Sequence, residues 1–491
     1  MDDLSQKSIL KKLGALLLGN GMSQIINTFF VLILVRIFTQ EQYAIYRLGN
    51  QLIMTVSPFF VFGLPMTISL FLPRYKELKD RRNFIFQTIF LLILLGAIGS
   101  LLLSLNKNFI FSLYKNAELL DFLWVFSLSF FSEVVFSYFP FYMTTENKNK
   151  KLAISVTMLS LLKLSSIFIS MAMGNDFKVF MYTFAFSSLV KVIYVILEPL
   201  YYYKVKLKEI TKIDIKKQLV ESVPIGMTNV VTAFGKNLGN NLVAIKYTSL
   251  QYATYITGAF EVPFIGILRA SITGAVLPSF SAMFSHSNKD KQNEIITSFR
   301  KTVGISGIII LPIMIGLITY SYGAISILFP KYTDANIIFK IYMLLLPTQI
   351  ANFSTLLLVA NKQMKVLLYS VGGILVNVLF FFIFYNTLGF YFVALSTVIA
   401  EYAQLIMILF DVKKFYHQEK LFSVLPIKDF TIVTISNILI YGAIYVVSNN
   451  FIDTNKPITA LVLGGISFGI CMLFNATRMP EIKNKLRKVR K

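Results

Sequence analysis

Long apolar stretches separated by short polar connections recur along the chain from Leu13 to Phe474. The hydrocarbon core of a bilayer, about 30 Å thick, is crossed by about 20 apolar residues in a helix. The pattern therefore predicts an all-α polytopic membrane protein with about fourteen transmembrane helices. We expect these helices at residues 13–35, 48–72, 83–105, 122–144, 152–173, 179–200, 219–245, 255–281, 303–325, 341–360, 366–386, 390–410, 430–448 and 458–474.

Charge is scarce in this sequence, and its placement is informative. Only 14% of the 491 residues are charged, against about 25% in an ordinary soluble domain. A net charge of +23 would suggest a nucleic-acid partner in a soluble protein. With the N-terminus inside, however, most of the 47 lysines and arginines fall on cytoplasmic connections, as the positive-inside rule requires. We therefore expect both termini in the cytoplasm and no nucleic-acid partner.

A twelve-residue motif occurs twice. Residues 38–49 read FTQEQYAIYRLG and residues 247–258 read YTSLQYATYITG, at an offset of 209. Six predicted spans separate the copies, and an even number gives both halves the same orientation, a plan used by several transporters. The repeat predicts two pseudo-symmetric six-helix lobes around a central cavity, followed by two further helices.

The expected organisation follows from this repeat and from the basic segments. We expect an N-terminal lobe at 1–203, a basic cytoplasmic linker at 204–218 and a C-terminal lobe at 219–411. The two additional spans lie within 412–474, and the tail at 475–491 is again basic. Glycines and prolines at Ser57-Pro58 and Gly63-Leu64-Pro65 predict a kink in the second span.

Several predicted spans carry polar side chains that are costly in a bilayer. An ionisable group at the bilayer centre costs about 2.5 to 3.5 kcal/mol, so such groups usually face a bundle interior or a wet cavity. Asparagines recur on one face of the first, second and seventh spans, and we expect them to form the wall of a polar cavity. They are Asn20, Asn27, Asn50, Asn229 and Asn240.

The charged residues in these spans have a cationic bias that suits an anionic cargo. We expect Arg47, Lys163, Lys236 and Arg269 to bind a pyrophosphate, because guanidinium and ammonium groups bind phosphate oxygens. The opposing carboxylates are Glu133, Glu261 and Glu401, for which either pairing across helices or coupling to protons or sodium is expected. For Lys191, a local pair with Glu198 seven residues later is an equal alternative to a place in the cavity.

Residues 34–46, LVRIFTQEQYAIY, resemble the exit of the first span in polysaccharide repeat-unit (O-antigen) flippases, usually written LARxLGPEEYGLY. Those proteins belong to the multidrug, oligosaccharidyl-lipid and polysaccharide exporter superfamily. The resemblance implies transfer of an undecaprenyl-pyrophosphate-linked oligosaccharide across a bacterial cytoplasmic (inner) membrane, by alternating access, for O-antigen or capsule synthesis. Expected partners are that substrate, membrane lipids and a polysaccharide polymerase. Phe38-Thr39-Gln40 replaces the usual Leu-Gly-Pro, and Ala44 replaces the glycine.

Three other functions compete with this interpretation. A lipid II flippase shares the fold, but its expected Arg-Asp pair is absent from the first span. An ion-coupled multidrug exporter typically has twelve spans and acidic residues for cationic drugs. A membrane-embedded glycan-modifying enzyme would need a catalytic constellation, and His286 and His417 lie singly in loops. We expect no catalytic residue, no cofactor other than a coupling ion, and no metal site, since Cys471 is the single cysteine.

Overall fold

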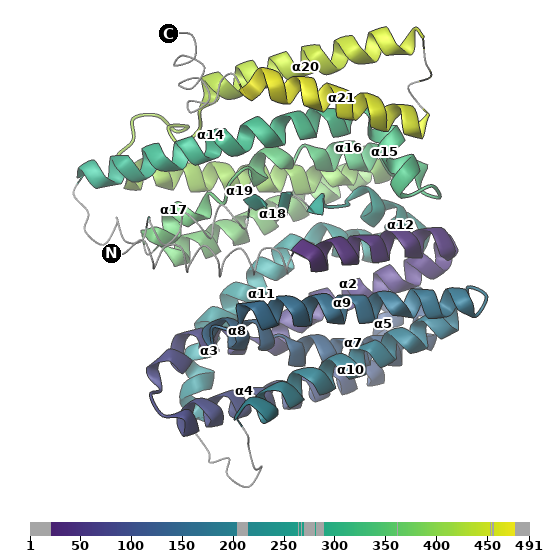
Figure 1. Ribbon diagram of the computed structural model, residues 1–491, viewed down its shortest axis with the longest axis vertical. Coiled ribbons are helices and arrows are strands. Elements are labelled where there is room, and N and C mark those ends of the chain that lie inside the picture. Colours follow the sequence, from purple (N-terminus) through teal and green to yellow (C-terminus); the bar gives the residue numbers. More distant parts are fainter. Residues whose placement is uncertain are drawn as a thin grey trace. The chain divides into compact units, whose positions relative to one another are not determined.

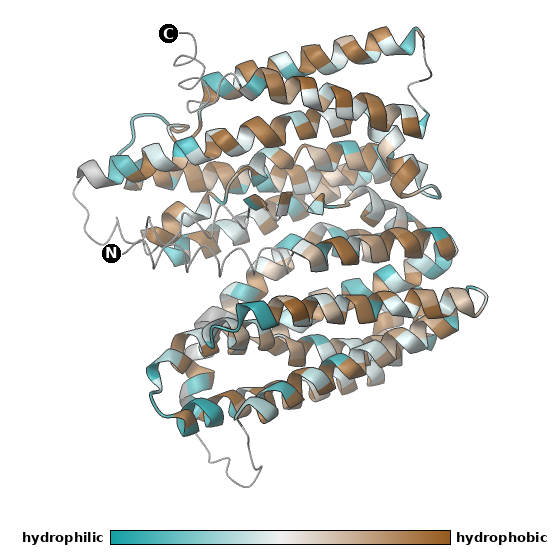
Figure 2. Ribbon diagram, in the orientation of Figure 1, coloured by the Kyte–Doolittle hydropathy of each residue, from teal (hydrophilic) through white to brown (hydrophobic). Residues whose placement is uncertain are grey.

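The computed structural model describes residues 21–203, 215–263, 265–266, 268–269, 280, 289–360, 362–451, 453 and 456–476. This part of the chain is helical and contains no strand, as predicted. Within it, nine helices are long and apolar enough to cross a membrane, or up to eleven if each of two bent pairs is one span. The long helices are mostly apolar along their length (Figure 2). The predicted count of fourteen is not confirmed, and the first and eighth predicted spans lie partly outside the described residues.

The chain forms two compact units, which divide after Ala253. The first helix described in the first unit is Gly21–Ile37. Its other helices are α2 (Gln40–Val61), α3 (Leu64–Phe71), α4 (Leu78–Leu105), α5 (Lys107–Tyr114), α6 (Ala117–Asp121), α7 (Leu123–Phe136), α8 (Phe139–Thr145), α9 (Asn149–Ala172), α10 (Phe177–Tyr203) and α11 (Ile215–Lys246) (Figure 1). The division lies beyond the predicted linker at 204–218, most of which is outside the described residues.

Helix α11 belongs to the first unit because it packs against α2 and α3. The Gln218 amide donates to Thr67 Oγ1 at 3.1 Å and to Thr88 Oγ1 at 2.7 Å. Gly226 lies so close to Gly63 that a Cβ on Gly63 would meet the Gly226 nitrogen at 2.6 Å. Buried polar pairing and close backbone contact thus fasten α11 to this unit.

The predicted kink of the second span is confirmed. Helices α2 and α3 meet at 48°. Between them Phe62 has φ 40° and Gly63 has φ 76°, and this left-handed conformation ends α2. Pro65 then occupies the first turn of α3, where no intrahelical hydrogen bond is lost.

The repeated motif forms the same helix start twice. The Thr39 hydroxyl accepts from Gln42 N at 3.2 Å, and the Gln42 side chain accepts from Thr39 N at 3.1 Å. Thr248 and Gln251 repeat this reciprocal pairing with the same two distances, 3.2 and 3.1 Å, at the start of α12 (Ser249–Gly258). Both are capping boxes, which satisfy amides that a helix start leaves unpaired.

The repeat also ends on glycines that occupy equivalent packing positions. A Cβ on Gly49 would lie 2.1 Å from the Phe126 ring of α7. In the second unit, a Cβ on Gly258 would lie 2.6 Å from Ile338 Cβ of α16 (Asn336–Met343). Each copy of the motif therefore brings its helix into close contact with a later helix of the same unit.

The second unit contains two C-terminal helices that pack beside a long central one. Its other helices are α14 (Lys289–Thr319), α15 (Ser321–Leu328), α17 (Ser354–Val359), α18 (Gln363–Thr387), α19 (Ala394–Phe415), α20 (Ile427–Asn449) and α21 (Pro457–Ala476). Helices α20 and α21 run along α14 (Figure 1). Cys471 is buried there in an apolar cluster with Ile315, Tyr320, Tyr441 and Ala460. Short 3-10 turns lie at Leu72–Arg74, Thr333–Ala335, Leu346–Gln349 and Phe390–Val393.

Candidate functional site: a charged cavity in the first unit

A polar cavity of about 250 Å³ lies among membrane helices of the first unit. Its walls come from the helix at Gly21–Ile37, α2, α7, α9 and α10. Two lysines and a glutamate lie among hydroxyl and amide groups. The polar lining residues are Ser23, Asn27, Asn50, Ser129, Glu133, Ser160, Lys163, Ser187, Ser188 and Lys191. Because charge inside a membrane helix is costly, this cavity is the first candidate for a functional site.

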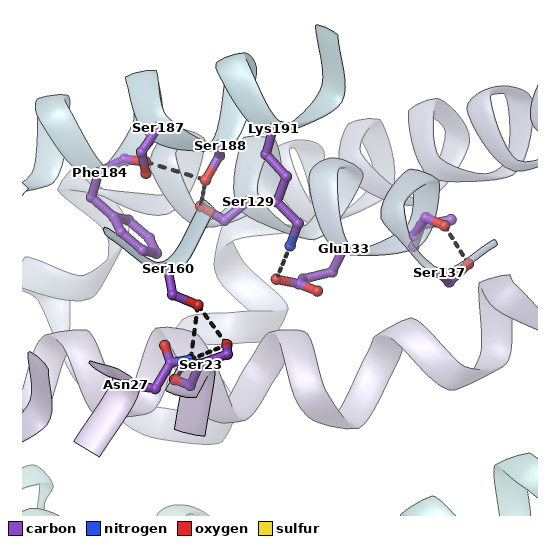
Figure 3. Close-up of polar contacts among 11 residues, drawn as sticks. Ser23, Asn27, Ser129, Glu133, Ser137, Ser160, Phe184, Ser187, Ser188 and Lys191 are labelled. Carbon is purple, nitrogen blue, oxygen red and sulfur yellow. Dashed lines mark hydrogen bonds and ion pairs between the residues drawn. The ribbon is translucent and has the colours of Figure 1, made fainter. Parts of the chain in front are cut away.

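One side of the cavity is a network of hydroxyls and an amide. The Ser23 and Ser160 hydroxyls lie 2.6 Å apart and share a hydrogen bond between the first helix and α9. Asn27 Nδ2 donates to Ser23 O at 2.9 Å and lies 3.4 Å from Ser160 Oγ (Figure 3). Across the cavity, the Ser129 and Ser188 hydroxyls lie 3.1 Å apart and join α7 to α10. Small hydroxyl residues thus let these helices approach closely while pairing their polar atoms.

An ion pair crosses from α7 to α10 at the same cavity. Lys191 Nζ lies 2.6 Å from Glu133 Oε1 (Figure 3). The Glu133 side chain is 51% exposed and that of Lys191 is 18% exposed, so the carboxylate faces the open cavity. Pairing across helices, one of the two expectations for Glu133, is therefore what the structure shows.

Lys163 lies among aromatic rings. Its ammonium is 4.5 Å from the centre of the Phe30 ring and 5.7 Å from that of Phe184. Ring faces stabilise a cation without neutralising it. Of the residues that the structure describes, none forms an ion pair with Lys163. With the Glu133–Lys191 pair neutral in sum, Lys163 gives the cavity a net positive charge.

The expected local pair of Lys191 with Glu198 is wrong. Glu198 Oε1 instead accepts from Lys151 Nζ at 2.7 Å and from Lys148 Nζ at 3.3 Å, both at the start of α9. Two helical turns separate Lys191 from Glu198, about 10 Å along the axis, so each side chain finds a nearer partner on a neighbouring helix.

The cavity brings together Asn27, Asn50, Glu133 and Lys163 of the predicted site. Arg47 does not line it and instead stacks over the Tyr43 ring at 5.9 Å. The predicted role of Arg47 in substrate binding stays a prediction.

The other predicted site residues lie elsewhere. Asn229 and Lys236 are exposed on α11, and Asn240 is half-buried there. Asn20 lies outside the described residues. In the second unit Glu261 is exposed, while Arg269 and Glu401 are half-buried. Their expected roles in substrate binding and ion coupling stay predictions.

A buried hydrogen-bond network joins Gln51 and Thr55 of α2 to Asn241 of α11, a pairing that the sequence did not predict. Asn241, rather than Asn240, is the buried asparagine of α11, and its Oδ1 accepts from Gln51 Nε2 and from Thr55 Oγ1, each at 2.7 Å. Tyr252 Oη donates to Gln51 Oε1 at 3.3 Å. Side chains of neighbouring residues in a helix point about 100° apart around its axis. The apolar periodicity of the sequence does not decide which of two neighbouring asparagines faces the interior.

Within the described residues, no group of three or more His, Cys, Asp or Glu side chains could hold a metal ion. The polar groups of the cavity are ammonium, hydroxyl and amide groups with one carboxylate. They suit hydrogen bonding to a polar or anionic solute better than coordination of a transition metal.

The fold is shared with solved membrane transporters. The chain is similar to a structure of the lipid II flippase MurJ in an inward closed conformation, with a TM-score of 0.72 and 19% identity over 91% of this chain and 96% of that chain. An inward-facing multidrug resistance MATE family transporter of the MOP superfamily is similar with a TM-score of 0.64 and 14% identity, over 83% of this chain and 96% of that chain. A MOP superfamily transporter from Pyrococcus furiosus is similar with a TM-score of 0.60 and 15% identity, over 84% of this chain and 96% of that chain.

The sequence comparisons identify the family. No curated protein sequence matches the chain. A family model described as polysaccharide biosynthesis protein matches residues 33–335, which include both copies of the repeated motif and the cavity-lining helices α2, α7, α9 and α10. The chain therefore belongs to this family of polysaccharide biosynthesis proteins and is a multi-pass membrane protein with the fold of MurJ and the MATE transporters.

Proposed function

We propose that the protein is a flippase that moves an undecaprenyl-pyrophosphate-linked oligosaccharide across the bacterial inner membrane, for synthesis of a surface polysaccharide such as O-antigen or capsule. The family supports a role in polysaccharide biosynthesis, and the fold supports a transporter rather than an enzyme. The observation that carries the proposal is the net positive cavity formed by Lys163, Lys191 and Glu133 within apolar helices.

The chemistry of the cavity suits the polar end of such a substrate. Lys163 supplies an ammonium whose charge is not cancelled by an ion pair with a described residue. Asn27, Asn50 and the cavity serines offer donors and acceptors of the kind that sugars and phosphates bind. In the proposal, Arg47, Lys236 and Arg269 also contact the pyrophosphate, the termini lie in the cytoplasm, and a polysaccharide polymerase receives the product.

Transport against a gradient needs an energy source. In our proposal it is coupled to protons or sodium, and Glu133, Glu261 and Glu401 are the carboxylates that take part. Glu133 is the best supported of the three because it faces the cavity and contacts a lysine from another helix.

Complementation of a deletion strain tests the proposal. Cells that lack the protein should accumulate lipid-linked oligosaccharide on the cytoplasmic leaflet and lose surface polysaccharide. Lys163→Met should restore less than a tenth of the export at equal protein level, because it removes the unpaired cation but keeps side-chain length. The matched control Lys178→Met replaces an exposed lysine near the end of a span and should restore export fully. Full export by Lys163→Met would contradict a role for the cavity charge.

A lipid II flippase is the second candidate, since the MurJ structure has a TM-score of 0.72 with this chain. Both substrates carry a lipid pyrophosphate, so the cavity charge does not separate them. Depletion of the protein does: failure to deliver lipid II stops wall synthesis and lyses cells, whereas failure to deliver a surface polysaccharide unit leaves the wall intact.

A further inference from the structure

A second hollow adjoins the charged cavity and lies where α9 begins beside α10. Its volume is about 550 Å³. One end is basic, with Asn147, Lys148, Lys150 and Lys151, and the other end is apolar, with Ile154, Met158 and Leu159. Tyr194 of α10 closes its side. Residues 147–151 span the start of α9 and residues 154–159 follow within its next two turns, so the groove is basic at the helix start and apolar further along the helix.

The basic end carries more positive than negative charge. Lys148 and Lys151 share one oxygen of the buried Glu198 carboxylate, at 3.3 and 2.7 Å. Lys148 is held further by the Tyr142 hydroxyl, 2.8 Å from its Nζ, and by the Tyr202 ring, whose centre is 3.0 Å away. Both lysines are therefore fixed in place, and one carboxylate cannot balance them together with Lys150.

Lys150 is the lysine that is available to a ligand. It is exposed, and no described residue forms an ion pair or hydrogen bond with it. An exposed ammonium beside this net positive cluster can bind an anionic group of a ligand at this point.

The deeper end of the groove suits a hydrocarbon chain. The side chains of Ile154 and Met158 are 52% and 59% exposed. The polar atoms in the wall are already satisfied, because the Ser155 and Tyr194 hydroxyls hydrogen-bond each other. Methylene groups can therefore lie along this wall without leaving a polar atom unpaired.

We propose that this groove binds an anionic glycerophospholipid, with its phosphodiester on Lys150 and an acyl chain along Ile154 and Met158. Basic pockets between transmembrane helices on the cytoplasmic side recognise anionic headgroups. The groove adjoins the charged cavity, because Leu159 lines both, but its basic end and the residues Ile154 and Met158 line the groove alone.

Native mass spectrometry of the full-length protein tests the site. The purified protein is presented with equal amounts of phosphatidylglycerol and phosphatidylcholine of identical chains. We expect preferential retention of phosphatidylglycerol by the wild type. Lys150→Gln should lower that retention about fivefold, the effect of about one interfacial lysine. The control Lys79→Gln removes another exposed lysine of the first unit and should leave retention unchanged.

A second variant separates groove binding from a diffuse charge effect. Ile154→Trp fills the apolar end but keeps every lysine, and it should also lower phosphatidylglycerol retention. Equal retention of both lipids by the wild type, or equal losses in Lys150→Gln and Lys79→Gln, would overturn the proposal. So would displacement of phosphatidylglycerol by equimolar inorganic phosphate or polyprenyl pyrophosphate. None of these results depends on glycan export, so the proposed function can fail or stand independently.

Discussion

The ion pair between Glu133 and Lys191 gives the sharpest test of the cavity geometry. Lys191→Met removes the ammonium that lies 2.6 Å from Glu133 Oε1 and leaves a carboxylate without its partner among membrane helices. Fully exposed pairs contribute about 0 to 1 kcal/mol, whereas breaking a buried pair costs about 3 to 5 kcal/mol. With 18% of the Lys191 side chain and 51% of the Glu133 side chain exposed, this pair lies between those limits. We expect Lys191→Met to lower the free energy of unfolding by about 2 kcal/mol.

Removing both charges should cost less than removing one. The double variant Glu133→Gln, Lys191→Met leaves neither member of this pair charged without its partner, so its stability should return toward that of the wild type. A double-mutant cycle, measured by reversible unfolding in detergent, should give a coupling energy of about 1 to 2 kcal/mol. The exchanged pair Glu133→Lys, Lys191→Glu should be more stable than either of its single changes. If the single effects add to the double effect within about 0.5 kcal/mol, the two side chains do not interact and the cavity geometry is wrong.

Two further predictions concern the repeated motif. Gly49→Ala should lower the unfolding free energy by about 1 to 3 kcal/mol, because the new Cβ would lie 2.1 Å from the Phe126 ring. The control Gly442→Ala should be neutral or stabilising, because a Cβ there would meet nothing within 4 Å. Thermal unfolding in detergent measures both changes, and equal midpoints would refute the packing argument. Thr39→Ala and Thr248→Ala should each lower the free energy of unfolding by about 1 kcal/mol, because each removes a helix cap. Serine at either position should retain most of the stability that the threonine cap provides. A serine variant as unstable as the alanine variant would show that the hydroxyl is not the stabilising group.

The sequence predicted features that follow from local physics. Apolar length predicted the membrane helices, and Gly63 with Pro65 predicted the break between α2 and α3. The cost of charge in a bilayer singled out Lys163 and Glu133, which share one cavity with two of the predicted asparagines, Asn27 and Asn50. Each inference uses residues that are close in sequence or the properties of a single side chain.

The partners of those side chains could not be predicted in this way. Glu133 and Lys191 are 58 positions apart, and Gln51 and Asn241 are 190 apart. Helical periodicity assigns a residue to a face but does not determine which helix that face meets. The pairing of Lys191 with Glu198 was a natural expectation from one helix, and it fails because α7 and α9 present nearer partners.

The repeat shows which residues serve the scaffold and which are special to one unit. Its shared positions form a capping box and a close glycine contact in each copy, so they organise backbone rather than bind a solute. The charges of the cavity lie outside the motif, with Glu133 on α7, Lys163 on α9 and Lys191 on α10. Since intramembrane charge is costly, these three charges are explained by a task of the first unit rather than by the shared fold. Substrate recognition should therefore respond to changes in these three charges more than to changes in the motif by which the family is recognised.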